Sequence, residues 1–422
     1  MQETAKLVLG IDLCDDITQI TVMRPHAAEP DTVSFDVHTG REYLPTVLHL
    51  GTDGEWSIGA DNRDGSTQIT SFFRAAVKGE TVHAAGLAFS GRELLVCYLA
   101  LLFNKIRERF EPQEIGFVAV TCEEAGTREF VKKMLSDILD QAEFISGRYL
   151  VLSHLEAFLH FVIRQEEGLW KNGSAVFDYT ADGLLFYFME CRIAGGRRLL
   201  LADYKDYSEI IPPGFVEEGE TERRALTFER LAGMALQQRV ASLFVTGRGF
   251  EGEWVSDVLR LLSGGRRVFR GQNLYTQGAC YAGAEVFRQE QNVDFALLTP
   301  GQITVDVSMV AETASGEENV LLARIGESYR KINAEVEVLL DATDKLSFRI
   351  LQAGAAEPVQ IRIAPKIADL RGDRTNRYLV RLFFAKKDIM VIQLKETGFG
   401  EFYPSEYRIY EELIDFSQWE FK

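Results

Sequence analysis

Cysteines are few in this sequence and form no motif. The 422 residues include five, Cys14, Cys97, Cys122, Cys191 and Cys280, and no two of them make a Cys-x-x-Cys pair. An odd number of scattered cysteines argues against a disulfide framework and against a zinc site. The six histidines do not cluster with them in the sequence. We therefore expect reduced thiols, as in a cytosolic protein.

Long hydrophobic runs are also missing. The first apolar run, Leu7–Leu13, is short and contains Asp12, which is not the pattern of a secretory leader. The longest run, Leu94–Phe103, is well below the roughly 20 residues that a helix needs to cross a bilayer. We expect a buried helix there, no membrane partner and a cytoplasmic location.

Positively charged residues are fewer than negatively charged ones. Lys and Arg number 46 against 63 Asp and Glu, which gives a net charge of −17. Such a surface repels phosphates, so we expect no nucleic-acid partner. The composition is otherwise ordinary for a globular protein, with 46% apolar and 26% charged residues. A chain of this length can form two or three domains.

Strands and helices alternate through residues 1–288. Lys6–Arg24 alternates as two strands around the polar turn Cys14-Asp15-Asp16, and the segment Ser174–Cys191 repeats the pattern of strand, polar turn and strand. Ser90 and Ser153 are suited to cap helices, Ser90 with Glu93 as its capping-box partner. These patterns indicate an α/β region.

Residues 290–422 have a different character. Segments of period two, separated by Gly, Asp and Lys turns, predict an all-β module of the sandwich type. Tyr378–Phe384 and Ile389–Lys395 form its most distinct hairpin. After Pro404 we expect a helix that packs with Tyr407, Tyr410 and Leu413.

One short motif points to a known superfamily. Gly10-Ile11-Asp12-Leu13 resembles the first phosphate loop of the actin/hexokinase/heat-shock ATPases, and most closely that of DnaK-type chaperones (Gly-Ile-Asp-Leu-Gly-Thr-Thr). In that fold two related lobes each present a β-hairpin turn to the nucleotide phosphates. Glycine is needed in such turns because backbone N–H groups approach the phosphates closely. Here Cys14, Asp15 and Asp16 stand where the family has Gly-Thr-Thr.

A second motif lies where the family has its second loop, Asp-Leu-Gly-Gly-Gly-Thr. Asp178 takes the place of the second acidic residue, but Thr180, Ala181 and Asp182 follow, and Gly183 is the one glycine left. Both phosphate loops are therefore degenerate.

Weaker matches follow in the family's order. Ser153–Ala157 resembles the hinge helix, with Glu156 as its acid, and Phe244–Gly249 resembles the adenosine loop. Gln277-Gly278-Ala279 resembles the closing helix, and Arg74 and Lys78 lie near the place of the family's lysine. The resemblance implies a two-lobed actin-like (ribonuclease H-like) ATPase fold, with lobes at residues 1–166 and 167–289, followed by the C-terminal all-β module at 290–422.

The same resemblance implies a set of site residues. They are Asp12, Asp178 and Glu156 as catalytic residues, Asp12 and Asp178 as metal ligands, and Gly10, Asp15, Gly183, Gly247, Gly249 and Gly278 as contacts to a cofactor. The implied cofactor is ATP or ADP with magnesium, and the degenerate loops leave the alternative that none is bound. Asp15 and Asp16 favour a solvated acidic turn over a metal site.

We expect structural rather than functional roles for the other candidate residues. No histidine lies near Cys14 in the sequence, so we expect no nucleophilic role for it. His154 and His160 are off the spacing of a helical metal pair, and we expect them to be packing residues.

These patterns favour a bacterial-type binding or scaffold protein with weak nucleotide binding and no efficient ATP hydrolysis. We expect a protein or peptide partner at the exposed strand edges of the C-terminal module. The alternative is an active ATP-dependent chaperone with altered phosphate loops. A relative of sugar kinases is a third hypothesis, but no catalytic aspartate on a loop facing the cleft is identified for it.

Overall fold

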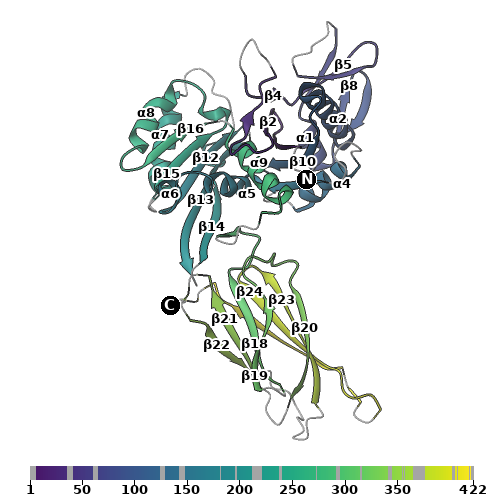
Figure 1. The fold of residues 1–422 in the computed structure, drawn as a ribbon, viewed down its shortest axis with the longest axis vertical. Helices are drawn as coiled ribbons and strands as arrows, with labels where there is room; N and C mark the ends of the chain where they lie inside the picture. Colours follow the sequence, from purple (N-terminus) through teal and green to yellow (C-terminus); the bar gives the residue numbers. More distant parts are fainter. Residues whose placement is uncertain are drawn as a thin grey trace. The chain divides into compact units, whose positions relative to one another are not determined.

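The computed structural model describes residues 6–35, 41–59, 65–123, 129–141, 148–180, 182–194, 197–211, 221–236, 240–271, 273–290, 295–313, 316–340, 345–353, 355, 357–364, 376–401, 404–405, 407–417 and 419. The chain is mixed α/β, as expected. It divides into two compact units (Figure 1), the first of Met1–Glu190 and Tyr204–Asn292, and the second of Cys191–Asp203 and Val293–Lys422. Most of both predicted lobes belongs to the first unit.

A mixed sheet in the first unit begins with the predicted N-terminal hairpin. Its strand order is β11-β10-β1-β2-β3, and β4 also pairs with β2. The strands are β1 (Leu7–Leu13), β2 (Ile17–Met23), β3 (Asp31–Thr32), β4 (Leu44–Pro45), β10 (Ile115–Cys122) and β11 (Tyr149–Ser153). Strands β1 and β2 are antiparallel, whereas β10 and β11 continue the sheet in parallel with β1. Every residue of β1 is buried, which is usual for a strand covered on both faces.

The second large sheet repeats this order. It runs β16-β15-β12-β13-β14-β17, with β12 (Ser174–Thr180), β13 (Gly183–Ala194), β14 (Arg197–Asp206), β15 (Ser242–Thr246), β16 (Arg267–Arg270) and β17 (Phe295–Leu298). Strands β12 and β13 form an antiparallel hairpin, and β15 and β16 extend the sheet in parallel with β12. The first hairpin strand is therefore central in both sheets.

Two of the helices begin at serine caps. They are α1 (Phe72–Lys78), α2 (Gly91–Phe110), α4 (Glu129–Asp140), α5 (His154–Val162), α6 (Glu167–Trp170), α7 (Thr221–Ala235), α8 (Trp254–Leu262) and α9 (Leu274–Phe287), with the 3-10 turn η2 (Arg248–Phe250). Ser90 and Glu93 form the predicted capping box at α2, and Ser153 and Glu156 form a second one at α5. No helix in the described parts of the chain has the length and apolar character to cross a membrane.

Two small sheets complete the first unit. One has the order β6-β5-β7 and the other is the hairpin β8-β9. Their strands are β5 (Leu48–Leu50), β6 (Trp56–Ile58), β7 (Thr67–Ile69), β8 (Thr81–Ala84) and β9 (Leu87–Ser90).

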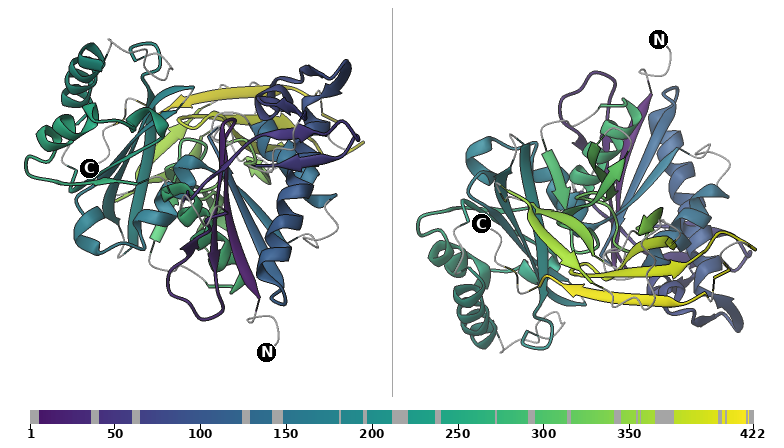
Figure 2. Two further views of the ribbon diagram at one scale, coloured as in Figure 1. Left: turned by 90° about the horizontal axis from the view of Figure 1, so that it is seen from above. Right: turned by 90° about the horizontal axis from the view of Figure 1, so that it is seen from below.

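Helix α9 joins the two halves of the first unit. It packs against both α5 and β1, and Figure 2 shows it in green beside the purple β1. The Oγ1 of Thr21 donates to the carbonyl of Thr276 at 2.8 Å, and the Oγ1 of Thr276 donates to the carbonyl of Gly10 at 2.9 Å. These buried bonds fix the first turn of α9 near the end of β1.

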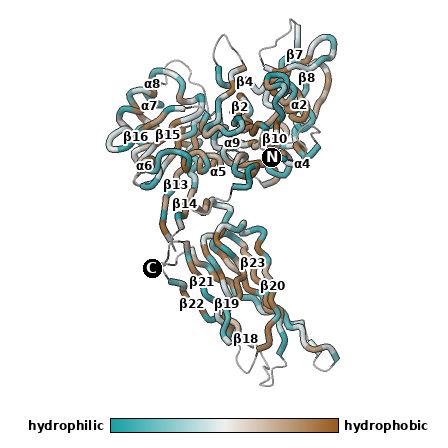
Figure 3. The backbone as a smooth tube through the Cα atoms, viewed as in Figure 1, coloured by the Kyte–Doolittle hydropathy of each residue, from teal (hydrophilic) through white to brown (hydrophobic). Residues whose placement is uncertain are grey.

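The second unit contains two four-stranded antiparallel sheets. Their orders are β19-β18-β21-β22 and β20-β23-β24-β25, with β18 (Val305–Thr313), β19 (Gly316–Ala323), β20 (Asn333–Leu340), β21 (Leu346–Gln352), β22 (Val359–Ile363), β23 (Asn376–Lys386), β24 (Ile389–Glu396) and β25 (Ile409–Asp415). One apolar core draws on both sheets, with Phe348 from the first and Ile392 from the second. Figure 3 shows brown, hydrophobic stretches along strands such as β18 and β23.

The predicted hairpin of this unit is present as β23 and β24, but the helix expected after Pro404 is wrong. Ile409–Asp415 is strand β25, which pairs antiparallel with β24 from Ile389 to Lys395. The apolar side chains of Ile409 and Leu413 are four residues apart, a spacing that fits one face of a helix or of a strand. The open edge of β24 offers main-chain hydrogen bonds, and these select the strand.

Candidate functional site

The two predicted acidic residues occupy corresponding places in the two sheets. Asp12 lies near the end of β1 opposite Thr121 of the parallel strand β10. Asp178 lies near the end of β12 opposite Thr246 of the parallel strand β15. Both carboxylates are buried, with exposures of 5% and 2%. A buried carboxylate needs a partner, because leaving water is costly for an ion.

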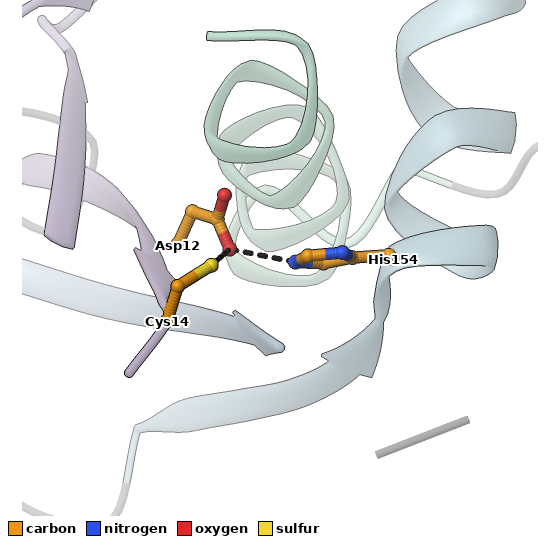
Figure 4. A group of neighbouring side chains, drawn as sticks. All are labelled: Asp12, Cys14 and His154. Atoms are coloured by element: carbon orange, nitrogen blue, oxygen red, sulfur yellow. Dashed lines mark hydrogen bonds and ion pairs between the residues drawn. The ribbon is translucent and has the colours of Figure 1, made fainter. Parts of the chain in front are cut away.

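That partner is His154, the first residue of α5. Its Nε2 lies 2.8 Å from Oδ1 of Asp12, and its Nδ1 lies 3.5 Å from Oδ2 of Asp178. The ring of Tyr275 stacks on the imidazole, with the ring centres 3.9 Å apart and the planes 7° from parallel. Figure 4 shows the ring pointing from the start of α5 toward Asp12 at the end of β1. The imidazole therefore lies between the two acids.

The surroundings of His154 favour its charged form. Burial by itself lowers the pKa of a histidine, but the charge and hydrogen bond of Asp12, together with Asp178, raise the pKa of His154 to about 10. Near neutral pH the ring is consequently an imidazolium with one nitrogen toward each carboxylate. One positive charge faces two negative charges in a buried site.

Arginines neutralise the acidic turn between β1 and β2. The Nη2 of Arg74 lies 3.5 Å from Oδ2 of Asp15, and the main-chain N–H of Arg74 donates to Oδ1 of Asp15 at 2.9 Å. The Nη1 of Arg248 donates to Oδ2 of Asp16 at 3.2 Å. The same Arg74 Nη2 also donates to Asp182 of the second turn at 2.5 Å. Arg74 therefore ties the two turns together, so the expected solvated acidic turn is in fact paired.

The space between the described parts of the two turns is small. A cavity of about 30 Å³ lies there, lined by Asp12, Cys14, Asp16, Ile17, Gln19, His154, Asp178, Thr180, Thr246, Gly247, Arg248 and Tyr275. A volume of this size holds one or two waters, whereas small-molecule sites usually have roughly 300–1,000 Å³. The cavity itself is therefore of the size of bound water rather than of a small-molecule ligand.

Close contacts with neighbouring protein atoms explain the presence of glycine at the positions that were expected to contact a cofactor. A Cβ on Gly10 would lie 2.2 Å from the carbonyl oxygen of Thr276, and one on Gly278 would lie 1.9 Å from that of Ala157. Similar contacts, to Tyr179 and Ser208, surround Gly247, Gly249 and Gly183. Gly247 also needs its positive φ of 93°. Of these five glycines, Gly247 alone lines the cavity.

Glu156 lies apart from the other predicted catalytic residues. Its Oε2 accepts hydrogen bonds from the main-chain N–H of Ser153 at 2.7 Å and from Nζ of Lys132 at 2.6 Å. Burial raises the pKa of this carboxyl, but Lys132 and Ser153 outweigh it and the net direction is downward. Glu156 does not line the cavity around Asp12 and Asp178. Its contacts are those of a helix cap with an ion pair.

The sequence interpretation of His154 as a packing residue is wrong. His154 contacts both acids of the site, and Tyr275, which was not singled out, covers its face. A local signal is present, because His154 directly follows β11, which is parallel to β10 and through it to β1, and parallel strands end at the same edge of a sheet. His160, by contrast, lies 3.2 Å from Glu285 and takes no part in the site.

Side chains suited to a metal gather around His154. Ligand atoms of Asp12, Cys14 and His154 all lie within 4.8 Å of one another, and so do those of Glu123, His154 and Asp178. The thiol of Cys14 donates to Oδ1 of Asp12 at 3.7 Å. The absence of a nearby histidine in the sequence was therefore misleading for Cys14, because the fold places His154 beside it.

Comparison with known proteins divides the chain in two. Residues 29–300 match the family of unknown function (DUF5716) C-terminal, and residues 302–416 match the domain of unknown function (DUF8552). No curated protein matches the chain. The two matches meet near the point where the second unit resumes at Val293. Because the first match covers more than half of its residues, the chain belongs to the DUF5716 C-terminal family.

Proposed function

We propose that this protein is a degenerate heat-shock-chaperone-like nucleotide-binding fold that acts as a binding or scaffold protein without efficient ATP hydrolysis. The observation that carries the proposal is the position of His154. Its imidazole lies between Asp12 and Asp178, the residues that by resemblance would hold a metal-bound nucleotide.

The repeated sheet order supports the two-lobed actin-like part of the proposal. Each large sheet has a central hairpin strand, an antiparallel partner on one side and two parallel strands on the other. Helices α5 and α9 each follow the outermost parallel strand and pack against each other. Two related lobes that present hairpin turns to one site are the arrangement the resemblance implies.

The charges at the site disfavour phosphoryl transfer. Catalysis of that reaction depends on a metal ion that bridges phosphate oxygens and on cations that neutralise developing charge. Here His154 already occupies both acids that would position the metal. Separating a buried ion pair by removing one partner costs about 3–5 kcal/mol, so a magnesium ion must offset a comparable loss to displace the imidazolium.

Partner binding is assigned to the C-terminal unit. Strands β19, β22, β20 and β25 are at the edges of its two sheets. On β25 the apolar side chains of Ile409 and Leu413 are 60% and 59% exposed. An edge strand with exposed apolar side chains is suited to a peptide that adds a further strand.

A second function is favoured by one observation. Arg74 and Arg248 both pair with the first turn, and Arg74 also pairs with Asp182 of the second. Arginine can exchange a carboxylate for a phosphate. If both side chains make that exchange, the protein is an active ATP-dependent chaperone with altered phosphate loops. In that case unfolded peptide must change the affinity for nucleotide, because coupled sites influence one another reciprocally.

The test is calorimetric titration of the full chain with ATP and with ADP, each with magnesium, beside a phosphate-release assay. We expect binding weaker than low micromolar and phosphate release at the level of the Asp12→Asn variant. Low-micromolar binding with steady phosphate release that Asp12→Asn abolishes would overturn the proposal. Nucleotide affinity that changes on addition of unfolded peptide would establish the chaperone instead.

A further inference from the structure

The cluster of Asp12, Cys14 and His154 combines three different kinds of ligand atom. A carboxylate oxygen, a thiol sulfur and an imidazole nitrogen lie within 4.8 Å of one another at the edge of one cavity. Asp12 and His154 are at least nine-tenths buried. We propose that these three side chains form a binding site for a single zinc-type divalent ion. The proposal requires neither a nucleotide nor a partner protein, so it goes beyond the proposed function.

The distances are close to those of a tetrahedral zinc site. Zinc bonds of about 2.0–2.3 Å to nitrogen, oxygen and sulfur place neighbouring ligand atoms roughly 3.3–3.6 Å apart. The sulfur of Cys14 is 3.7 Å from Oδ1 of Asp12, and Nε2 of His154 is 2.8 Å from the same oxygen. An ion would therefore separate Asp12 and His154 by about half an ångström, while the distance between Cys14 and Asp12 already has almost the value that zinc requires.

The kinds of ligand select against magnesium. Magnesium is bound through oxygen, whereas zinc accepts thiolate and imidazole together with carboxylate. Two of the three ligand atoms here are sulfur and nitrogen. The site therefore differs from the magnesium site on Asp12 and Asp178 that the resemblance implies.

The second nitrogen of His154 has the environment expected for a metal ligand. Histidines that bind a metal through one nitrogen usually direct the other N–H toward a carboxylate or carbonyl, which fixes the ring. Here Nδ1 faces Oδ2 of Asp178 at 3.5 Å. Both of these atoms are buried and make no hydrogen bond within the described residues. Movement of His154 toward a bound ion would change this distance without exposing either atom to water.

The cavity also holds a polar atom that has no partner, which is an independent indication of a ligand. Among the described residues, Nε2 of Gln19 is buried without a hydrogen-bond partner, and Gln19 lines the cavity. A zinc ion with three protein ligands takes a water as its fourth. That water would accept a hydrogen bond from Gln19. About 30 Å³ suffices for the ion and one water.

The charge of the cluster permits the exchange of protons for a divalent ion. Thiolate and neutral imidazole are the forms that bind a metal. A divalent ion would therefore replace the proton on the Cys14 sulfur and the extra proton on His154. Two positive charges leave as protons and two arrive with the ion, so the buried site gains no net charge.

The test uses cobalt(II) as a probe. The full chain is freed of metal with a chelator, which is then removed, and cobalt(II) is added while the absorption spectrum is recorded. We expect a near-ultraviolet thiolate-to-cobalt band that saturates at one equivalent and disappears when zinc is added. The band is expected to be lost in Cys14→Ser and kept in Cys97→Ser, a matched change at a half-buried cysteine of α2.

A further variant examines the role of Asp178. Asp178→Asn should retain the band but weaken cobalt binding by about 10–100-fold. Circular dichroism of each variant establishes that it is folded. Absence of the band from the native chain at one equivalent, or its persistence in Cys14→Ser, would overturn the metal site. Neither result bears on ATP binding or hydrolysis, which the calorimetric experiment decides separately.

Discussion

Replacement of His154 by glutamine should make the stability of the protein less dependent on pH. The pKa of His154 is raised from 6.5 to about 10 in the folded chain. A histidine with a raised pKa contributes stability that is fully present below its unfolded pKa and is lost as pH rises through its folded pKa. The relevant window therefore runs from about pH 6.5 to above pH 10.

The size of the effect follows from the pKa difference. Each unit corresponds to about 1.4 kcal/mol. Protonation of His154 then contributes about 4 kcal/mol at pH 7 and about 1 kcal/mol at pH 9.5. The difference in unfolding free energy between the native chain and His154→Gln should consequently narrow by about 3 kcal/mol over this range. Only the change of this difference with pH reports the protonation of His154, because the loss of packing against Tyr275 lowers the unfolding free energy equally at both pH values.

The assay is unfolding in urea in the presence of a chelator, and tryptophan fluorescence monitors the unfolding. Three of the four tryptophans, Trp56, Trp170 and Trp254, belong to the first unit, so the signal mainly reports the part that contains the site. Other groups also titrate in this range. Burial raises the pKa of Cys97, and it raises that of Cys280 to about 12, so both thiols oppose folding at high pH. Both proteins carry these thiols, and their effect cancels in the comparison.

A double-mutant cycle assigns the effect to the ion pair. The coupling between His154→Gln and Asp12→Asn should be about 3–5 kcal/mol at pH 7, as for other buried charged pairs. It should fall toward zero above pH 10. A stability difference that is the same at pH 7 and pH 9.5 would refute the assignment of His154 as an imidazolium between two carboxylates.

Three further predictions concern the supporting structure. Gly278→Ala should destabilise the protein by about 1–3 kcal/mol or more, because its Cβ would lie 1.9 Å from the carbonyl oxygen of Ala157. Thermal unfolding measures the loss. The matched control is Gly233→Ala in α7, where an added Cβ would meet no atom within 4 Å, and it should be neutral or stabilising. Arg74→Met should cost less than about 1 kcal/mol in urea unfolding, since the arginine is 40% exposed and its contacts to Asp15 and Asp182 are screened by solvent. A larger loss of unfolding free energy would contradict this weak contribution. Glu156→Gln should destabilise the protein at pH 7 but not in acid: the pKa of Glu156 is lowered, so its contribution is present above the unfolded pKa and is lost as pH falls through the folded pKa. An unfolding difference that persists at low pH would contradict the Glu156 prediction.

Local sequence patterns correctly predicted the elements that depend on residues close together in the chain. The capping box at Ser90 and the helix cap at Ser153 form as predicted, since the partner of each serine lies three residues away. The N-terminal hairpin and the pair β23 and β24 follow from alternation on either side of a turn. The strand β25 does not, because its spacing suits a helix as well, and pairing with β24 decides between them.

Asp12 and Asp178 were singled out in the sequence by the resemblance of their motifs to the phosphate loops, and Arg74 by its place near the family's lysine. The contacts that these residues make were not predicted. His154 and Tyr275 come from α5 and α9, and Arg74 and Arg248 come from segments far from the turns that they neutralise. No local pattern encodes these contacts, since each depends on where the end of a distant element lies.

The sequence by itself therefore determined the N-terminal hairpin, the capping box at Ser90 and the change to a β module near residue 290, whereas the resemblance of Asp12 and Asp178 to the acids of an ATPase site stays a prediction. The tertiary structure decided that a histidine lies between the acids, that arginines pair with the acidic turn and that glycines such as Gly278 contact neighbouring backbone. The reason is physical. Turns and caps depend on residues next to one another in the chain, whereas the charge of a buried site depends on every group that folding brings within a few ångströms.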